Sequence, residues 1–295
     1  MSNFAAIDLS ALPQPAAVQT WTLDAIVSAR LSDFTARMQA AGIAYDTSGL
    51  ESEPAVKLQE TGAFREGLIY QRINEAVLAT SLPYAQGDDL DVVAAAFQTF
   101  RAPGELDPSL RRRAQLAWEA LSQGGSYGGY RYKALSAAPV DLADVAVYGS
   151  EVAGVSPGQV MIVCLGASAS GLPSAGTLNL VRAAFPRVNR KVNDQIVVRA
   201  ATPAPYSVDA TLILSPGADP ATVVAAQTTA LNTFAASRRA IGASVSAGNI
   251  EAVLGYSAAG LVYDIQVRSP VGLTGGDPFS APLLTGARVV PAPRT

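Results

Sequence analysis

Two stretches in the first third of the chain carry apolar residues at the spacing of an α-helix. The first, from about Trp21 to Ala41, is expected to bury one stripe, made of Leu23, Ile26, Val27, Leu31, Phe34 and Met38. The second begins at Pro54, a residue suited to the first helical turn, and continues to about Thr80. Its apolar positions form two stripes on different sides, namely Ile69, Ile73, Ala76 and Val77, and separately Phe64, Leu68 and Leu78. Two stripes imply two neighbours, which are either helices of a monomeric bundle or helices of another chain.

The segment 81–97, SLPYAQGDDLDVVAAAF, places three carboxylates between a glycine and an apolar run. Such a cluster has three interpretations: a metal loop, a catalytic acid pair, or the start of a helix. A calcium loop alternates oxygen ligands over about twelve residues and closes with a glutamate, whereas Asp91 is followed by VVAAAF. We therefore expect Asp88 or Asp89 to cap a helix by accepting backbone N–H bonds.

The next helix is predicted to start with Asp107 as N-cap and Pro108 at the first helical position. Its buried side would comprise Leu110, Ala114, Ala117, Trp118 and Leu121, with Arg111, Arg112 and Arg113 spread around the remainder. A glycine-rich turn then leads into a helix that carries Tyr130, Tyr132 and Leu135. This glycine cluster lacks the lysine and the spacing of a phosphate-binding loop.

Strands follow at residues 144–149 and 159–165. The second of these, QVMIVCL, is apolar on both faces and is therefore predicted to lie at the centre of a sheet, with Cys164 as a buried structural residue. A helix around Thr177–Phe185 and a strand around Asp194–Ala201 complete this set of elements.

The last third of the chain alternates apolar and polar residues in two places. In 206–215 the residues expected on the buried face are Tyr206, Val208, Ala210, Leu212 and Leu214, and in 261–269 they are Leu261, Tyr263, Ile265 and Val267. A helix that Asp219 caps and Pro220 begins lies between them, followed by a shorter helix at about 247–254. A final strand is predicted at 287–292.

These elements predict an α+β multidomain protein, with an N-terminal helical bundle segment followed by two small α+β domains with mostly antiparallel sheets. We divide the chain into an extended arm over 1–20, a helical region over 21–104, a first α+β domain over 105–202 and a second over 203–295.

Composition narrows the chemistry. The 295 residues include no histidine, which excludes Ser-His-Asp and Cys-His catalysis and the commonest zinc and iron ligand sets. A net charge of −3 disfavours nucleic-acid binding, and the single cysteine excludes an intramolecular disulfide framework. No secretory signal and no apolar run of about 18 residues is present, so we expect a protein that folds in the cytoplasm and is not inserted in a membrane.

Four segments together carry a family resemblance. They are IDLSALPQP, ESEPAVKLQETGAFREGLIYQRINEAV, YAQGDDLDVVAAAF and DPSLRRRAQLAWEALSQGGSYGGYRYKALSA. In this order they resemble the baseplate J-like proteins of contractile phage tails and related tail-like particles. The resemblance extends from about Ile7 to Val267.

The resemblance implies a structural subunit of the baseplate wedge, without catalysis or cofactor, made in the bacterial cytoplasm and located in the virion or tail-like particle. Its N-terminal helices would bundle with a second copy of the chain and a partner wedge subunit, while its α+β domains would pair with neighbouring wedges around the hub and spike. Sheath-initiating proteins are further expected partners. The interface residues we predict are Phe64, Leu68, Ile69, Ile73, Val77, Leu23, Val27 and Phe34. The loop Phe100–Glu105 is a candidate hinge for the rearrangement on contraction.

Two other functions stay open at this point. One is a receptor- or glycan-binding tail module that uses the tyrosines between Tyr127 and Tyr132. The other is a carboxylate-dependent hydrolase that uses Asp88 with Asp89, or Glu51 with Glu53.

Overall fold

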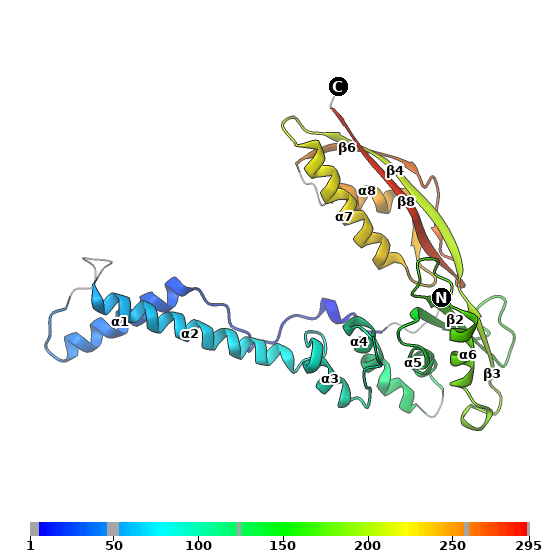
Figure 1. Cartoon of the computed structure of the whole chain (residues 1–295), viewed down its shortest axis with the longest axis horizontal. Coiled ribbons are helices and arrows are strands. Elements are labelled where there is room, and N and C mark those ends of the chain that lie inside the picture. The colour runs from blue at the N-terminus through cyan, green and yellow to red at the C-terminus, as the bar shows by residue number, and fades with distance from the viewer. Residues whose placement is uncertain (1–5, 46–52, 123–124, 257–259, 294–295) are drawn as a thin grey trace. The chain divides into compact units, whose positions relative to one another are not determined.

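The computed structural model describes residues 6–45, 53–122, 125–256 and 260–293 (Figure 1). The chain divides into two compact units. Ile7–Phe100 forms the N-terminal unit, and Arg101–Thr295 forms the body of the C-terminal unit. An α+β multidomain architecture was predicted, and this prediction is confirmed.

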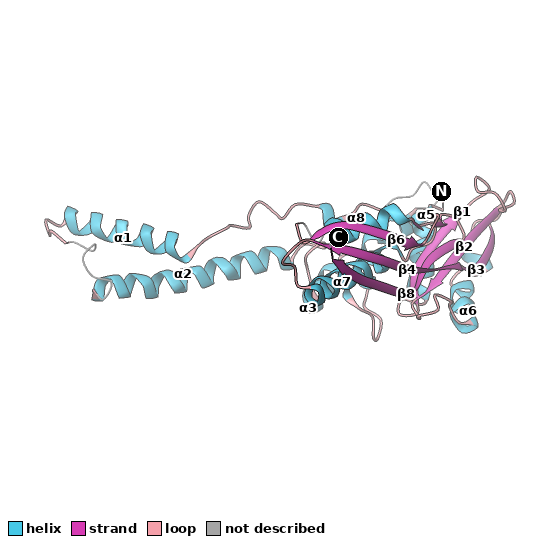
Figure 2. Ribbon diagram, turned by 90° about the horizontal axis from the view of Figure 1, so that it is seen from above, coloured by secondary structure: helices cyan, strands magenta, loops and turns pink. Residues whose placement is uncertain are grey.

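The N-terminal unit is helical. Its elements are the short 3-10 helix η1 (Leu9–Ala11), α1 (Leu23–Ala40), α2 (Pro54–Ala79) and α3 (Gly87–Ala95). The views of Figures 1 and 2 both show α1 lying alongside α2. Thr22 caps α1 by accepting a hydrogen bond from the backbone N–H of Ala25, and Pro54 occupies the first turn of α2 as predicted.

The aspartates of the segment 81–97 do not cap α3, so this prediction is wrong. The N-cap is Gln86, and it makes no side-chain capping bond. Gly87 adopts a φ of +53°, a left-handed conformation that glycine tolerates, and the chain enters the helix there. Asp88 and Asp89 consequently lie in the first turn, where carboxylates favour the positive end of the helix dipole.

The C-terminal unit opens with three helical segments, which are α4 (Asp107–Leu116), the 3-10 helix η2 (Ala117–Leu121) and α5 (Tyr127–Ala137). Two details differ from the prediction. Asp107 is the first helical residue rather than the N-cap, which is Leu106. Trp118 and Leu121 are exposed, because the α-helix ends at Leu116 and the tighter 3-10 turn rotates the following side chains away from the core.

The first sheet has the order β1-β2-β3, with β1 (Leu142–Tyr148), β2 (Gln159–Gly166) and β3 (Gln195–Ala200). The central position predicted for 159–165 is confirmed. β2 pairs antiparallel with β1 and parallel with β3, so the sheet is mixed. A core of residues from α5, the sheet and α6 (Ala175–Ala183) includes Leu135, Ile162 and Val181, and Cys164 lies within it. A 3-10 turn, η3 (Arg187–Asn189), follows α6.

The second sheet has the order β6-β4-β8 and is again mixed. Its strands are β4 (Thr202–Leu214), β6 (Val262–Ser269) and β8 (Ser280–Pro293), and α7 (Pro220–Arg238) and α8 (Ala247–Tyr256) cover one face (Figure 1). A two-stranded sheet joins β5 (Ser244–Val245) to β7 (Thr274–Gly275). The buried face predicted for β4 is confirmed, since Tyr206, Val208, Ala210, Leu212 and Leu214 are all in the core. Asp219 caps α7 as predicted, accepting from Thr222 N.

The face predicted for β6 is wrong at its beginning. Leu261 and Tyr263 are exposed, whereas Val262 packs against the core together with Ile265 and Val267. Leu214 pairs with Val262 and Ile213 pairs with Asp264, which leaves Tyr263 as the extra residue of a β-bulge. A bulge shifts the alternation by one residue, so every side chain before it points to the opposite face.

Besides the core of each sheet, the C-terminal unit has a third cluster of buried residues, to which both sheets contribute. Phe279, just before β8, packs edge-on against Tyr148 of β1 with 5.6 Å between ring centroids, and the Arg199 guanidinium lies 5.0 Å from the Phe279 centroid. Ala201 and Ala281 are buried in the same cluster. The Asp144 carboxylate of β1 connects two further segments of this unit. It accepts a hydrogen bond from the backbone N–H of Ile241, which follows α7, and forms an ion pair with Arg131 of α5.

Candidate interaction surface

Small residues of α2 provide space for the side chain of Trp21, which lies just before α1. Ala63 and Gly67 of α2 are buried, and a Cβ atom added to Gly67 would lie 2.7 Å from the Trp21 ring. Glycine therefore provides the space that the indole ring occupies. The apolar pattern did not predict this face of α2, because small residues contribute little to a hydrophobic stripe.

Polar contacts fix the register of this helical hairpin. Arg30 of α1 pairs with Glu66 of α2 at 3.0 Å. Asn74 of α2 holds the preceding arm by two hydrogen bonds, accepting from Gln19 N at 3.0 Å and donating to Gln19 O at 2.8 Å. The arm is also held at Leu12, whose carbonyl oxygen accepts from the Tyr84 hydroxyl. The part of the arm from Leu12 to Gln19 is thus bound to the N-terminal unit of its own chain.

Both flanks of α2 expose large apolar side chains. On one flank Phe64 and Leu68 are 58% and 49% exposed, and on the other Ile69 and Ile73 are 60% and 49% exposed. Consecutive helical residues rotate by 100°, so the two flanks are separated by about 140° around the helix axis. We call these pairs the α2 flanks. Neither pair is buried by the described part of the chain.

The eight predicted interface residues therefore fall into two groups. The four residues of the α2 flanks are exposed, and so is Leu23 at the beginning of α1. Val27, Phe34 and Val77 are half-buried, and Phe34 makes an edge-to-face contact with Tyr45 at 5.4 Å between centroids. Their part in an interface with another chain stays a prediction.

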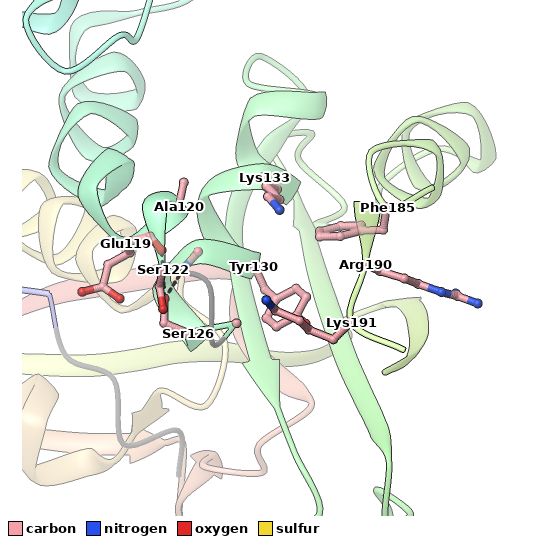
Figure 3. A pocket seen from close by; sticks show the side chains of 11 residues that line it. Glu119, Ala120, Ser122, Ser126, Tyr130, Lys133, Phe185, Arg190 and Lys191 are labelled. Carbon is pink, nitrogen blue, oxygen red and sulfur yellow. Dashed lines mark hydrogen bonds between the residues drawn. The ribbon is translucent and has the colours of Figure 1, made fainter. Parts of the chain in front are cut away.

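The tyrosine-rich helix α5 borders a small pocket, which Figure 3 shows. The pocket holds about 90 Å³, and Ser126 at its edge caps α5 by accepting from Gly129 N. The Tyr130 hydroxyl donates to the Asp194 carboxylate, and burial together with this bond raises the pKa of Tyr130. Arg190 extends away from the pocket in Figure 3. Tyr130 thus serves contacts within the fold, and the volume is well below the ~300–1,000 Å³ of common ligand pockets.

The carboxylates of the alternative hydrolase are not assembled into a cleft in the described residues. Asp88 and Asp89 are exposed on α3, and Glu53 accepts a hydrogen bond from the Tyr45 hydroxyl. Glu51 lies outside the described residues. Within the described ranges, no three histidine, cysteine or acidic side chains group as potential metal ligands. Cys164 is buried, which raises the pKa of its thiol to about 12.

A buried ion pair lies elsewhere in the C-terminal unit, and sequence reasoning missed it. Arg113 Nε and Nη2 donate to the two carboxylate oxygens of Glu105 at 2.8 and 2.5 Å, and both side chains are buried. Glu105 also accepts from Ala102 N and from the Ser109 hydroxyl. Glu105 lies before the beginning of α4 whereas Arg113 lies within it, so no i,i+3 or i,i+4 pattern links the two residues.

None of the helices in the part of the chain that the structure describes is long and apolar enough to cross a membrane.

The helix α2 exposes large apolar side chains on two sides, which favours contacts with other proteins. Comparison with known proteins agrees. Residues 51–103, which include α2 and α3, match the baseplate J-like N-terminal domain family. The chain is 34% identical over 267 residues to baseplate protein J of Escherichia phage P2, an alignment that covers 84% of this chain and 86% of that protein. The chain belongs to the baseplate J-like family, which confirms the resemblance seen in the sequence.

Proposed function

We propose that this protein is a structural subunit of the baseplate wedge of a contractile tail. In this role it acts through interfaces, without a substrate or a cofactor, and it resides in the baseplate of a virion or tail-like particle. Support comes from the relationship to a phage baseplate protein along most of both chains.

The observation that carries the proposal is the exposure of both α2 flanks. They lie within residues 51–103, the part of the chain that matches the family's N-terminal domain. Fully burying one large aliphatic or aromatic side chain contributes about 1.5–3 kcal/mol, so covering four half-exposed ones would contribute a few kcal/mol to assembly. Scattered apolar residues are normal on protein surfaces, but two adjacent pairs on one helix form continuous stripes.

The finer assignment gives each flank its own partner. One flank would pack against a second copy of the chain and the other against a partner wedge subunit, so that α1 and α2 form the centre of a larger bundle. The α+β modules of the C-terminal unit would contact neighbouring wedges around the hub and spike, with sheath-initiating proteins as further neighbours. Contraction would then shift the balance between two interface packings that differ by a few kcal/mol.

The test replaces each flank separately with charge. Phe64→Glu with Leu68→Glu alters one flank, Ile69→Glu with Ile73→Glu alters the other, and Ser28→Glu with Ser32→Glu adds the same charge to exposed positions of α1. Each variant is co-produced with the remaining tail proteins and analysed by size-exclusion chromatography with light scattering and by electron microscopy of tails.

We expect each flank variant to fold but to lose one class of complex, and the α1 variant to assemble normally. Normal tails from both flank variants would refute the interface assignment. An isolated wild-type chain that is monomeric and never enters a tail particle would refute the proposed function itself.

A further inference from the structure

A groove with mostly apolar walls lies beside the beginning of β1 in the C-terminal unit. One wall is formed by Leu106 and Pro108 at the start of α4, the other by Pro139 and Val140 before β1. The groove holds about 520 Å³, within the ~300–1,000 Å³ that ligand pockets commonly have. Leu106 and Val140 are 74% and 48% exposed, so the walls present apolar surface that the described chain leaves open.

The walls are held in place by buried polar contacts. Glu105, next to Leu106, is bound by Arg113 and by the backbone N–H of Ala102. The Ser109 hydroxyl bridges the two walls, since it contacts both the Glu105 carboxylate and the Pro139 carbonyl oxygen at 3.0 Å. A groove fixed in this way needs little ordering when a partner binds, which favours affinity.

One cation borders the groove and is incompletely paired. Arg112 Nη1 donates to the carbonyl oxygen of Ala143 at 2.5 Å, whereas its Nε is buried and has no hydrogen-bond partner among the described residues. Burial lowers the pKa of Arg112, and the attraction of the Asp144 and Glu105 carboxylates offsets this effect only in part.

The charged groups packed closest to Arg112 include two further cations and two carboxylates. Arg112 shares its neighbourhood with Arg131 and Arg113, against the two carboxylates Asp144 and Glu105. Each of these carboxylates is already engaged, Asp144 by Arg131 at 2.7 Å and Glu105 by Arg113. None of the residues that line the groove carries a carboxylate. The exposed Asp141, between the lining residues Val140 and Leu142, accepts a hydrogen bond from the Thr177 hydroxyl.

We propose that this groove binds a segment of another protein that carries an aspartate or glutamate next to aliphatic residues. The carboxylate would accept from the Arg112 guanidinium, and the aliphatic side chains would cover Leu106 and Val140. The apolar walls and the size of the groove favour such a segment over a small free anion. This inference does not depend on the proposed baseplate role, because it rests on residues distinct from the α2 flanks.

The experiment screens the full-length chain against a displayed library of random octapeptides, and the enriched peptides are then titrated as free fluorescent peptides. Arg112→Gln removes the cation, and Leu106→Glu adds a repelling charge to the wall without touching Arg112. The matched controls are Arg111→Gln, which loses the same charge one residue away, and Val271→Glu, which changes an exposed apolar residue outside the groove. Thermal unfolding checks that each variant is folded.

We expect the enriched peptides to place an acidic residue beside aliphatic ones. Their affinity should fall about tenfold or more with Arg112→Gln, with Leu106→Glu, and with exchange of the peptide's acid for its amide, while both controls bind like the wild type. Enrichment of peptides without a carboxylate, affinity unchanged by Leu106→Glu, or no enrichment at all would overturn the proposal. Self-association that Leu106→Glu abolishes would also overturn it, since a second copy would then be the occupant.

Discussion

At the scale of single residues, the ion pair between Glu105 and Arg113 is the interaction whose loss should cost most. Its bidentate geometry and its extra bonds to Ala102 and Ser109 satisfy both charges within the protein interior. Removing one partner of such a pair leaves the other charge buried without compensation, which lowers stability strongly. Breaking a pair at the surface changes stability little, because water solvates the remaining charge.

Glu105→Gln is accordingly expected to lower the free energy of unfolding of the C-terminal unit by about 3–5 kcal/mol. The control is Glu75→Gln, which breaks the exposed pair with Arg72 and should change the free energy by no more than about 0.5 kcal/mol. Urea unfolding followed by circular dichroism measures both. Equal effects would mean that the buried pair contributes no more than the exposed one.

The same pair predicts a dependence on pH. Burial raises the pKa of Glu105, but the hydrogen bonds from Arg113, Ala102 and Ser109 outweigh it and hold the pKa below the ordinary value of 4.5. A depressed native pKa contributes stability that is fully present above about pH 4.5 and is lost as the pH falls through the native pKa. The difference in stability between wild type and Glu105→Gln should therefore be constant near neutrality and shrink below pH 4.5.

At the scale of elements, the hairpin of α1 and α2 depends on the absence of a side chain at Gly67. Gly67→Ala would gain helix propensity of about 1 kcal/mol but must displace the Trp21 ring from its contact. With Trp118→Phe as background, Trp21 is the remaining tryptophan, and its fluorescence emission is expected to move to longer wavelength as the ring becomes more exposed.

Gly248→Ala is the matched control, because a Cβ added to this helical glycine meets no atom within 4 Å. Its emission spectrum should be that of the background protein. An unchanged emission maximum in Gly67→Ala would show that the hairpin adapts without moving Trp21.

Sequence patterns predicted elements well where one periodicity runs without interruption. β4 alternates from Tyr206 to Leu214, and its buried face was predicted correctly, as was the central place of β2. The pattern failed where geometry changes within an element. The bulge at Tyr263 inverted the face of β6, and the change to a 3-10 turn after Leu116 exposed Trp118.

The interaction surface was predictable from the sequence only where its residues repeat with the period of a helix. Exposed apolar residues on α2 are visible as stripes, so Phe64 and Ile69 could be singled out from the sequence. Contacts that depend on small residues or on distant partners carry no periodic signal. Gly67 against Trp21 and Glu105 with Arg113 are both of this kind.

At the scale of the whole molecule, the two compact units differ in how much core they possess. In α1 the only buried residue among those described is Ile26, and in α2 the buried residues are Val56, Ala63 and Gly67. The strand β4 alone buries Tyr206, Val208, Ala210, Thr211, Leu212 and Leu214. Local stability follows the number of buried contacts, so the hairpin should open more easily than the sheets.

Hydrogen exchange measured by mass spectrometry is expected to show faster exchange for the amides of α1 and α2 than for those of β2 and β4 in the isolated chain. In assembled tails the amides of α2 should become protected, because its flanks would be covered. Equal protection of both units in the isolated chain would contradict this view of the hairpin.

Part of the predicted hinge, Phe100–Glu105, is bound to the residues that follow it. Arg101 Nη1 donates to the carbonyl oxygen of Glu105 and its guanidinium pairs with Asp107 at 2.8 Å, so this stretch is fastened to the beginning of α4. The division between the compact units falls between Phe100 and Arg101. Motion about this loop stays a prediction, and it would have to use the backbone on the N-terminal side of Arg101.

The parallel pairing of β4 with β8 has a mechanical consequence. β4 is paired with β8 along all 13 of its residues, and the two strands run in the same direction. Tension applied between the start of β4 and the end of β8 would slide one strand along the other and load the whole ladder of hydrogen bonds together, instead of peeling the bonds apart one after another. The second sheet is therefore expected to resist extension and to transmit a tensile force along its strands.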